Sequence, residues 1–312
     1  MPSIQTSIAG SPRWIAVFVF ISSLFWGVGF ASGKSFAIEP DLSAAPLRAK
    51  HAELAQQLLN NQFQRALYLD SAESSHDLKG EIYAVVNYPF AIVNTALNNP
   101  AHWCDVLILH INIKYCHANK AGTALTVNIG RKYDQPLSSA YRLDFNYRAV
   151  LTTQEYFAVE LNAENGPLNT HNYHIWIEAT PVKAMSVKDE RTFLHVTYAY
   201  AFGLPGRLAM QSYLSTIGRD KIGFTIIGKL PDGQPAYIRG IRGVVERNTM
   251  RYYLAIDAYL AALTAPPQDQ LEKRLQHWFT NIEQYARQLH EVERADYLEM
   301  KRREYQRQQL AQ

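Results

Sequence analysis

The sequence predicts an α+β fold in which a curved antiparallel sheet packs against one long amphipathic helix. Between residues 79 and 245, segments of alternating, β-branched or aromatic residues follow one another with no long helical pattern between them. Sequential strands of this kind form antiparallel sheets. Residues 248–263 then carry apolar side chains at helical spacing, which indicates a single long helix after the strands.

The helix expected over residues 248–263 is the element around which the strands are arranged. Asn248 is a suitable N-cap, because its side-chain oxygen can accept from the free N–H groups of the first turn. At about 100° per residue, seven side chains share an arc of about 120°. They are Thr249, Tyr252, Tyr253, Ile256, Tyr259, Leu260 and Leu263. This stripe indicates either an ordinary core helix or one wall of a pocket beneath it.

The elements before this helix are predicted in chain order. Pro46 can begin a flanking helix that continues to Leu59. A loop is expected at 71–79, and a short helix between Pro89 and Pro100. A second short helix is expected at 206–217. Strands are expected at 81–88, 106–115, 123–132, 141–151, 156–163, 173–179, 191–202, 222–229 and 237–245.

The N-terminal 37 residues have the pattern of a secretory signal peptide. Arg13 precedes an apolar run over residues 14–30, and small residues follow it. The run is short for a membrane-spanning helix, which usually needs about 20 apolar residues, so an uncleaved N-terminal anchor is the alternative. We therefore expect export, to the bacterial periplasm or outside the cell, with membrane anchoring through the N-terminus as the other outcome.

The C-terminal segment, residues 265–312, is predicted to form a helix with heptad spacing. Its apolar residues recur with the 4-3 spacing of a coiled-coil seam. They are Leu271, Leu275, Trp278, Ile282, Tyr285, Leu289 and Val292. We expect this helix to pack on its own domain, with pairing to residues 47–69 or formation of a homodimer as alternatives. The chain then divides into a leader over 1–37, a linker and flanking helix over 38–78, a main domain over 79–264 and this C-terminal helix.

The charge of the chain gives no reason to expect a nucleic-acid partner. The net charge is +3, and the leader contains Arg13 and Lys34 but no acidic residue. Removal of the leader therefore leaves +3 − 2 = +1. So small a charge provides no general electrostatic attraction to nucleic acid or to a lipid surface.

Cys104 and Cys116 are the only cysteines of the chain. In an oxidising compartment they are expected to form a disulfide, which requires the chain to fold back between them. Three nearby histidines, His102, His110 and His117, raise a Cys/His metal site as a rival interpretation. Because the spacing fits no tight metal-binding pattern, we predict the disulfide and assign no metal and no cofactor.

Few residues of the chain suggest chemistry. None of the sequence patterns for a nucleophile elbow, a P-loop, an HExxH zinc site or a dinucleotide fingerprint occurs in its required context, so we assign no catalytic residue. Arg142, Asp144 and Arg148 share one strand face, where they would orient a ligand carboxylate or phosphate if the face points inward and would be solvated if it points outward. His174 and Glu178 also share a strand face, but about 13 Å of strand separates them, so they cannot contact each other.

Three stretches resemble the START-like superfamily, which has the helix-grip fold and includes lipid-transfer domains and polyketide cyclases. Residues 80–104, GEIYAVVNYPFAIVNTALNNPAHWC, are similar to its first strand, the following helix and the tryptophan after it. Residues 191–203, RTFLHVTYAYAFG, are similar to a long central strand, and residues 243–263, GVVERNTMRYYLAIDAYLAAL, to the closing helix. The resemblance lies in element order and pattern, because no residue motif is diagnostic of this superfamily.

The resemblance implies an apolar cavity between the closing helix and the sheet, which would hold a lipid or another hydrophobic small molecule. The residues expected to bind the ligand are Tyr83, Arg142, Asp144, Tyr147, Tyr198, Tyr200, Arg251, Tyr252, Tyr253 and Ile256. The leading hypothesis is thus an exported binding protein. The alternatives are a cyclase- or hydrolase-like enzyme on the same scaffold, and an interaction protein that oligomerises through its C-terminal helix.

Overall fold

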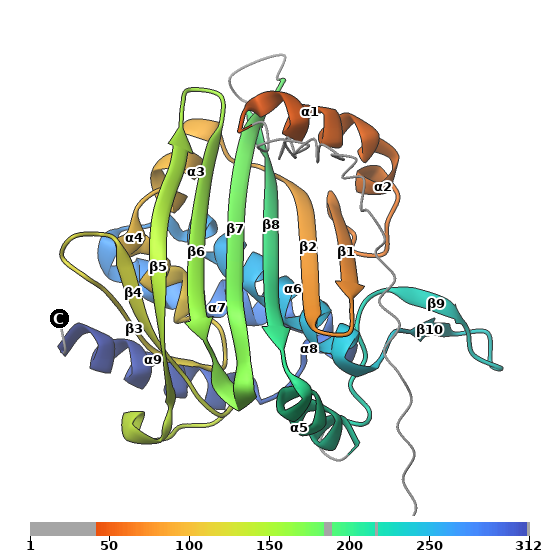
Figure 1. The fold of residues 1–312 in the computed structure, drawn as a ribbon. Coiled ribbons are helices and arrows are strands. Elements are labelled where there is room, and N and C mark those ends of the chain that lie inside the picture. The colour runs from red at the N-terminus through yellow and green to blue at the C-terminus, as the bar shows by residue number, and fades with distance from the viewer. Residues whose placement is uncertain (1–41, 184–188, 216–217, 311–312) are drawn as a thin grey trace, which may run out of the picture. The chain divides into compact units, whose positions relative to one another are not determined.

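The computed structural model describes residues 42–183, 189–215 and 218–310. These residues form an α+β fold with one eight-stranded antiparallel sheet and helices on both of its faces (Figure 1). This confirms the predicted fold class. The predicted leader, residues 1–37, lies outside the described ranges and stays a prediction.

The sheet is open and has the strand order β1-β2-β8-β7-β6-β5-β4-β3. Its strands are β1 (Leu67–Glu73), β2 (Asp77–Val86), β3 (Ile113–Ala118), β4 (Ala124–Ile129), β5 (Tyr141–Thr152), β6 (Phe157–Asn165), β7 (Thr170–Val182) and β8 (Arg191–Phe202). Every neighbouring pair is antiparallel. Strands β3 to β8 follow one another as neighbours, and β8 then pairs with β2. The chain therefore crosses the sheet once, between β2 and β3, through α3 (Phe90–Leu97) and α4 (Pro100–Leu107).

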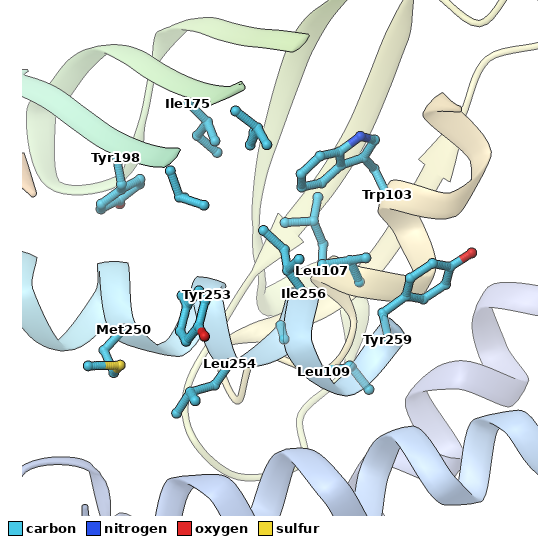
Figure 2. Packing of buried hydrophobic residues seen from close by; sticks show 14 of the residues in the cluster. Trp103, Leu107, Leu109, Ile175, Tyr198, Met250, Tyr253, Leu254, Ile256 and Tyr259 are labelled. Atoms are coloured by element: carbon cyan, nitrogen blue, oxygen red, sulfur yellow. The ribbon is translucent and has the colours of Figure 1, made fainter. Parts of the chain in front are cut away.

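The inner face of the sheet is covered by the long helix α6 (Gly240–Ala262), which contacts β1, β2 and β8. Alternation along β2 directs Ile82, Ala84 and Val86 into this core. Figure 2 shows Trp103 and Leu107 of α4 packed beside Ile256 of α6. Each fully buried aliphatic or aromatic side chain of this kind contributes about 1.5–3 kcal/mol.

The outer face of the sheet is covered in part by α1 (Ala44–Glu53) and α2 (Ala55–Leu59). The side chains of Leu47, Leu54 and Leu58 pack with Tyr156, which directly precedes β6, and with Phe193 of β8 in a second, smaller core. This is the flanking helix that the sequence predicted, divided into two helices at Leu54.

The C-terminal segment forms three helices instead of the single helix that we expected. They are α7 (Pro267–Glu283), α8 (Ala286–Leu289) and α9 (Arg294–Leu310). The seam residues Leu275, Trp278 and Ile282 are buried, and α7 packs on α6 while α9 packs on β3 and α7. The seam residues therefore pack within the chain, and formation of a homodimer stays a prediction.

Three expected strand or loop assignments differ from the structure. Residues 71–79 belong to the β1–β2 hairpin, so the sheet begins at Leu67 and not at residue 79. Residues 106–112 are the end of α4 and a buried turn, because Asn99 caps a helix whose first residue is Pro100. Leu109 and Ile111 of this turn are apolar because the turn is buried, and their alternation with polar residues suggested a strand.

The segment 237–245 is the third difference, because α6 already begins at Gly240. Ile241 and Val245 are spaced by four residues and are both buried, so they extend the helical stripe toward the N-terminus and Asn248 lies inside the helix. Before α6, α5 (Leu204–Ser215) is followed by a separate two-stranded hairpin, β9 (Ile226–Lys229) and β10 (Pro235–Tyr237), which does not join the main sheet (Figure 1).

Cys104 of α4 and Cys116 of β3 form a disulfide with their Cα atoms 5.1 Å apart, which confirms the predicted pairing. The turn at residues 108–112 brings the two cysteines together and is itself fixed by the bridge. Among the helices of the described residues, none combines the length and the apolar character that a membrane span requires.

Candidate functional site

A cavity of about 300 Å³ lies between the inner face of the sheet, α6 and the turn that follows α4. This volume is at the lower end of the range of about 300–1,000 Å³ that small-molecule sites span. One side of the cavity is aromatic and the other carries charged and hydrogen-bonding groups. We describe these two sides as the tyrosine wall and the polar side.

The tyrosine wall consists of Tyr173 of β7, Tyr198 and Tyr200 of β8, and Tyr252 of α6. The rings of Tyr173 and Tyr200 stack with centroids 5.2 Å apart, and those of Tyr198 and Tyr252 lie 5.1 Å apart. Tyr173 and Tyr198 are brought together because both strands alternate and direct these residues inward. Burial raises the pKa of the Tyr173 hydroxyl to about 12, so it is neutral, and it hydrogen-bonds the Thr170 hydroxyl at 2.7 Å.

The polar side is organised by Glu291, which lies between α8 and α9. Its carboxylate accepts from Arg251 at 2.8 Å, Lys132 at 2.5 Å and Lys221 at 2.9 Å. Burial alone would raise the pKa of this carboxyl, but the charges of Arg251 and Lys132 and the hydrogen bonds from the two lysines lower it to about 2. Glu291 is therefore ionised at neutral pH and fixes the position of the cations around it.

His110, in the turn after α4, lines the cavity and is almost completely buried. Its ring stacks on Tyr252 with centroids 4.7 Å apart, and Lys301 of α9 donates to its backbone carbonyl at 2.7 Å. Burial, together with the positive charges of Arg251, Lys301 and Lys114, holds the pKa of the imidazole well below its usual value of 6.5. His110 is therefore neutral at pH 7.

The structure brings four of the predicted ligand-binding residues to the cavity: Tyr198, Tyr200, Arg251 and Tyr252. Tyr253 and Ile256 of α6 are buried in the adjoining core (Figure 2). Tyr147 of β5 is also buried on the inner face, and burial raises the pKa of its hydroxyl to about 12. These three residues support the cavity and do not line it.

Tyr83, Arg142 and Asp144 lie on the outer face of the sheet, so we remove them from the candidate site. The neighbours of Tyr83 along β2 point into the inner core, and strand alternation turns Tyr83 toward α1. Arg142 and Asp144 form an ion pair of 3.0 Å in which both side chains are more than half exposed. Of the two alternatives that the sequence left open, an inward face and a solvated face, the structure therefore shows the solvated one.

Sequence reasoning did not predict His110, Lys132, Tyr173, Arg247 or Glu291 at the site. Tyr173 carries a usable signal, because it alternates with the buried Ile175 and Ile177. His110, Lys132 and Glu291 lie outside the helices and strands, where no periodic pattern assigns a direction to a side chain.

The outer face holds a second group of titratable residues around His195 of β8. Its Nδ1 atom lies 2.8 Å from Glu178 and its Nε2 atom 3.2 Å from Glu81. Burial alone would lower the pKa of His195, but the hydrogen bonds and charges of the two carboxylates raise it. Glu178 therefore pairs with the residue directly opposite on β8, and not with His174, which hydrogen-bonds Asn162 at 2.8 Å.

No protein-family model matches this chain, and no curated protein matches its sequence. Among solved structures, a conserved protein from Geobacillus kaustophilus is 9% identical, with 59% of this chain and 95% of that chain covered and a TM-score of 0.31. Human StAR-related lipid transfer protein 5 is 10% identical, with 56% of this chain and 91% of that chain covered and a TM-score of 0.29.

The fold assignment follows from the topology described above. The open antiparallel sheet, the helices between its first long strand and the next, and α6 across its inner face are the features of the helix-grip arrangement. The described residues therefore have the helix-grip arrangement that the resemblance predicted.

Proposed function

We propose that this chain is an exported protein that binds a hydrophobic small molecule or lipid in the cavity beneath α6. The observation that carries the proposal is the cavity itself, whose tyrosine wall combines apolar ring faces with hydroxyl groups. Such a lining is common in small-molecule sites. Export is supported by the leader pattern and by the disulfide, because disulfides persist mainly in oxidising compartments.

Binding is better supported than catalysis by the protonation states around the cavity. A general base near neutral pH needs a pKa close to 7. The pKa of Glu291 is lowered to about 2, and this carboxylate is held by three cations. The pKa of His110 is also lowered, and that of Tyr173 is raised to about 12. These shifts move the groups away from the range in which they would exchange protons with a substrate.

Native mass spectrometry of the gently purified protein, followed by organic extraction, tests the proposal. Val244 and Val182 are both half-buried valines, but only Val244 lines the cavity. We expect the wild type and Val182→Trp to retain one small hydrophobic molecule per chain, and Val244→Trp to lose it because the indole fills the cavity. Equal retention by the two variants, or a clean ligand-free mass for all three proteins after incubation with hydrophobic extracts, would contradict the proposal.

A further inference from the structure

The polar side of the cavity has features that define the chemical class of the ligand. We propose that the ligand is a small carboxylate amphiphile, with a single ring system or a single chain. Its carboxylate accepts a hydrogen bond from His110 Nε2–H beside the cations of the polar side, and its apolar part lies on the tyrosine wall. This inference rests on the proposed binding function and adds the identity of the head group.

The tautomer of His110 follows from its hydrogen bonding. The backbone N–H of Asn112 donates to His110 Nδ1 at 3.2 Å, so Nδ1 carries a lone pair. Because the imidazole is neutral, the proton must be on Nε2. Within the part of the chain that the structure describes, this Nε2–H has no acceptor, although the atom is buried.

An unsatisfied donor of this kind costs free energy, since burial removes its water partner. The cost is about 1–3 kcal/mol for a buried donor. Native proteins satisfy such groups with a protein acceptor, an ordered water or a ligand. Because His110 lines the cavity, we expect an oxygen of the bound ligand to be this acceptor.

The charge of the lining determines which oxygen fits best. Arg251, Lys132 and Lys221 contribute three positive charges around the carboxylate of Glu291, so this cluster on the polar side carries 3 − 1 = +2. Arg251 and Glu291 are only 4% and 7% exposed, and Lys132 and Lys221 are 29% and 27% exposed, so solvent screens the charge of this cluster only in part. An anionic head group would reduce the excess, whereas a neutral one would leave it unchanged.

The size of the cavity limits the apolar part of the ligand. A volume of about 300 Å³ is small even for a drug-sized molecule, so a lipid with two acyl chains cannot be enclosed. The tyrosine wall offers apolar ring faces, and an aromatic ring or a single extended chain can lie against them. Small aromatic and medium-chain carboxylic acids satisfy both limits.

Three probes of nearly equal shape separate the contributions of charge, acceptor and apolar surface: 2-naphthoate, 2-naphthamide and 2-methylnaphthalene. Their affinities for the full chain are measured by calorimetry or fluorescence at pH 7. We expect 2-naphthoate to bind about tenfold or more tightly than 2-naphthamide, because its hydrogen bond and its charge both contribute. We expect 2-naphthamide in turn to bind more tightly than 2-methylnaphthalene, which has no acceptor.

Two further measurements assign the effect to His110. In His110→Phe, which keeps a ring against Tyr252, the preference for 2-naphthamide over 2-methylnaphthalene should be lost, while His117→Phe, outside the cavity lining, should keep it. If His110→Phe does not fold, nitrogen NMR of the wild type replaces it, and the Nε2–H resonance of His110 should shift on addition of 2-naphthoate. No shift, or equal affinities for the three probes, overturns the inference and leaves the binding function intact. Failure of all three probes to bind overturns both.

Discussion

Replacement of Glu291 by glutamine tests how the polar side of the cavity is held together. The lowering of the Glu291 pKa from 4.5 to about 2, at about 1.4 kcal/mol per pH unit, corresponds to about 3 kcal/mol of folding free energy at pH 7. Loss of the charge also leaves Arg251, Lys132 and Lys221 without their shared partner. Removal of one partner from a buried ion pair costs about 3–5 kcal/mol, so the two estimates agree.

The direction of the pH dependence follows from the lowered pKa. The contribution of Glu291 is present above the unfolded-state pKa of 4.5 and is lost as the pH falls through the folded-state value of about 2. Urea unfolding at pH 7 and at several pH values below 5 therefore gives a falling free energy of unfolding for the wild type. In Glu291→Gln we expect a loss of about 3 kcal/mol at pH 7 and a flatter acid dependence.

Glu155 provides the matched control for this substitution. It pairs with Arg48 at 3.0 Å, but its side chain is 67% exposed. Exposed ion pairs contribute about 0–1 kcal/mol, so Glu155→Gln should change the free energy of unfolding only slightly. If Glu291→Gln costs no more than Glu155→Gln, or if it leaves the acid dependence unchanged, the description of Glu291 as the buried centre of the polar side is wrong.

Three other predictions concern the disulfide, the helix-to-sheet contact and the two buried histidines. The double variant Cys104→Ala/Cys116→Ala should lose about 3 kcal/mol in urea unfolding, the value expected for a bridge that spans 12 residues, and reduction of the wild type should give a similar loss. Gly80→Ala should cost about 1–3 kcal/mol, because a Cβ there would collide with Thr249 Oγ1, and the cost should be smaller when measured in a Thr249→Ala background. NMR titration should give His195 a pKa above 6.5 and His110 a pKa well below it. The stabilisation from His195 is then present below pH 6.5 and is lost as the pH rises through its folded-state pKa, whereas His110 destabilises the fold as the pH falls below 6.5. A normal pKa for either histidine, no loss in the double cysteine variant, or additive effects at Gly80 and Thr249 would each contradict the corresponding contact.

The sheet and the long helix were predictable because period-two and helical patterns carry that information directly. The predicted strand at 191–202 matches β8, and Tyr198, Tyr200 and Tyr252 were expected to lie at the cavity that they line. The sequence pattern does not show which face of a strand points to the core and which points to solvent. Arg142 and Asp144 alternate as clearly as the tyrosines do, and only the pairing of β5 in the sheet shows that they point to solvent.

The remaining errors come from burial that has no secondary-structure period. The turn at 108–112 is apolar because α9 covers it through the buried side chains of Lys301 and Tyr297, and this burial imitates a strand pattern. The residues of the polar side converge from segments as distant as Lys132 and Glu291, and their spacing in the sequence contains no trace of the contact. Such a site emerges only when the C-terminal helices pack on the sheet.

We propose that the ligand binds between the tyrosine wall and the rest of α6. Nuclear Overhauser effects between bound 2-naphthoate and the protein's ring protons test this directly, since they report only short distances. We predict contacts to Tyr198, Tyr200 and Tyr252, with none to Tyr83 on the outer face. Contacts to Tyr83 or to the exposed Ile227 of the β9–β10 hairpin, without contacts to the tyrosine wall, would show that the cavity is not the binding site.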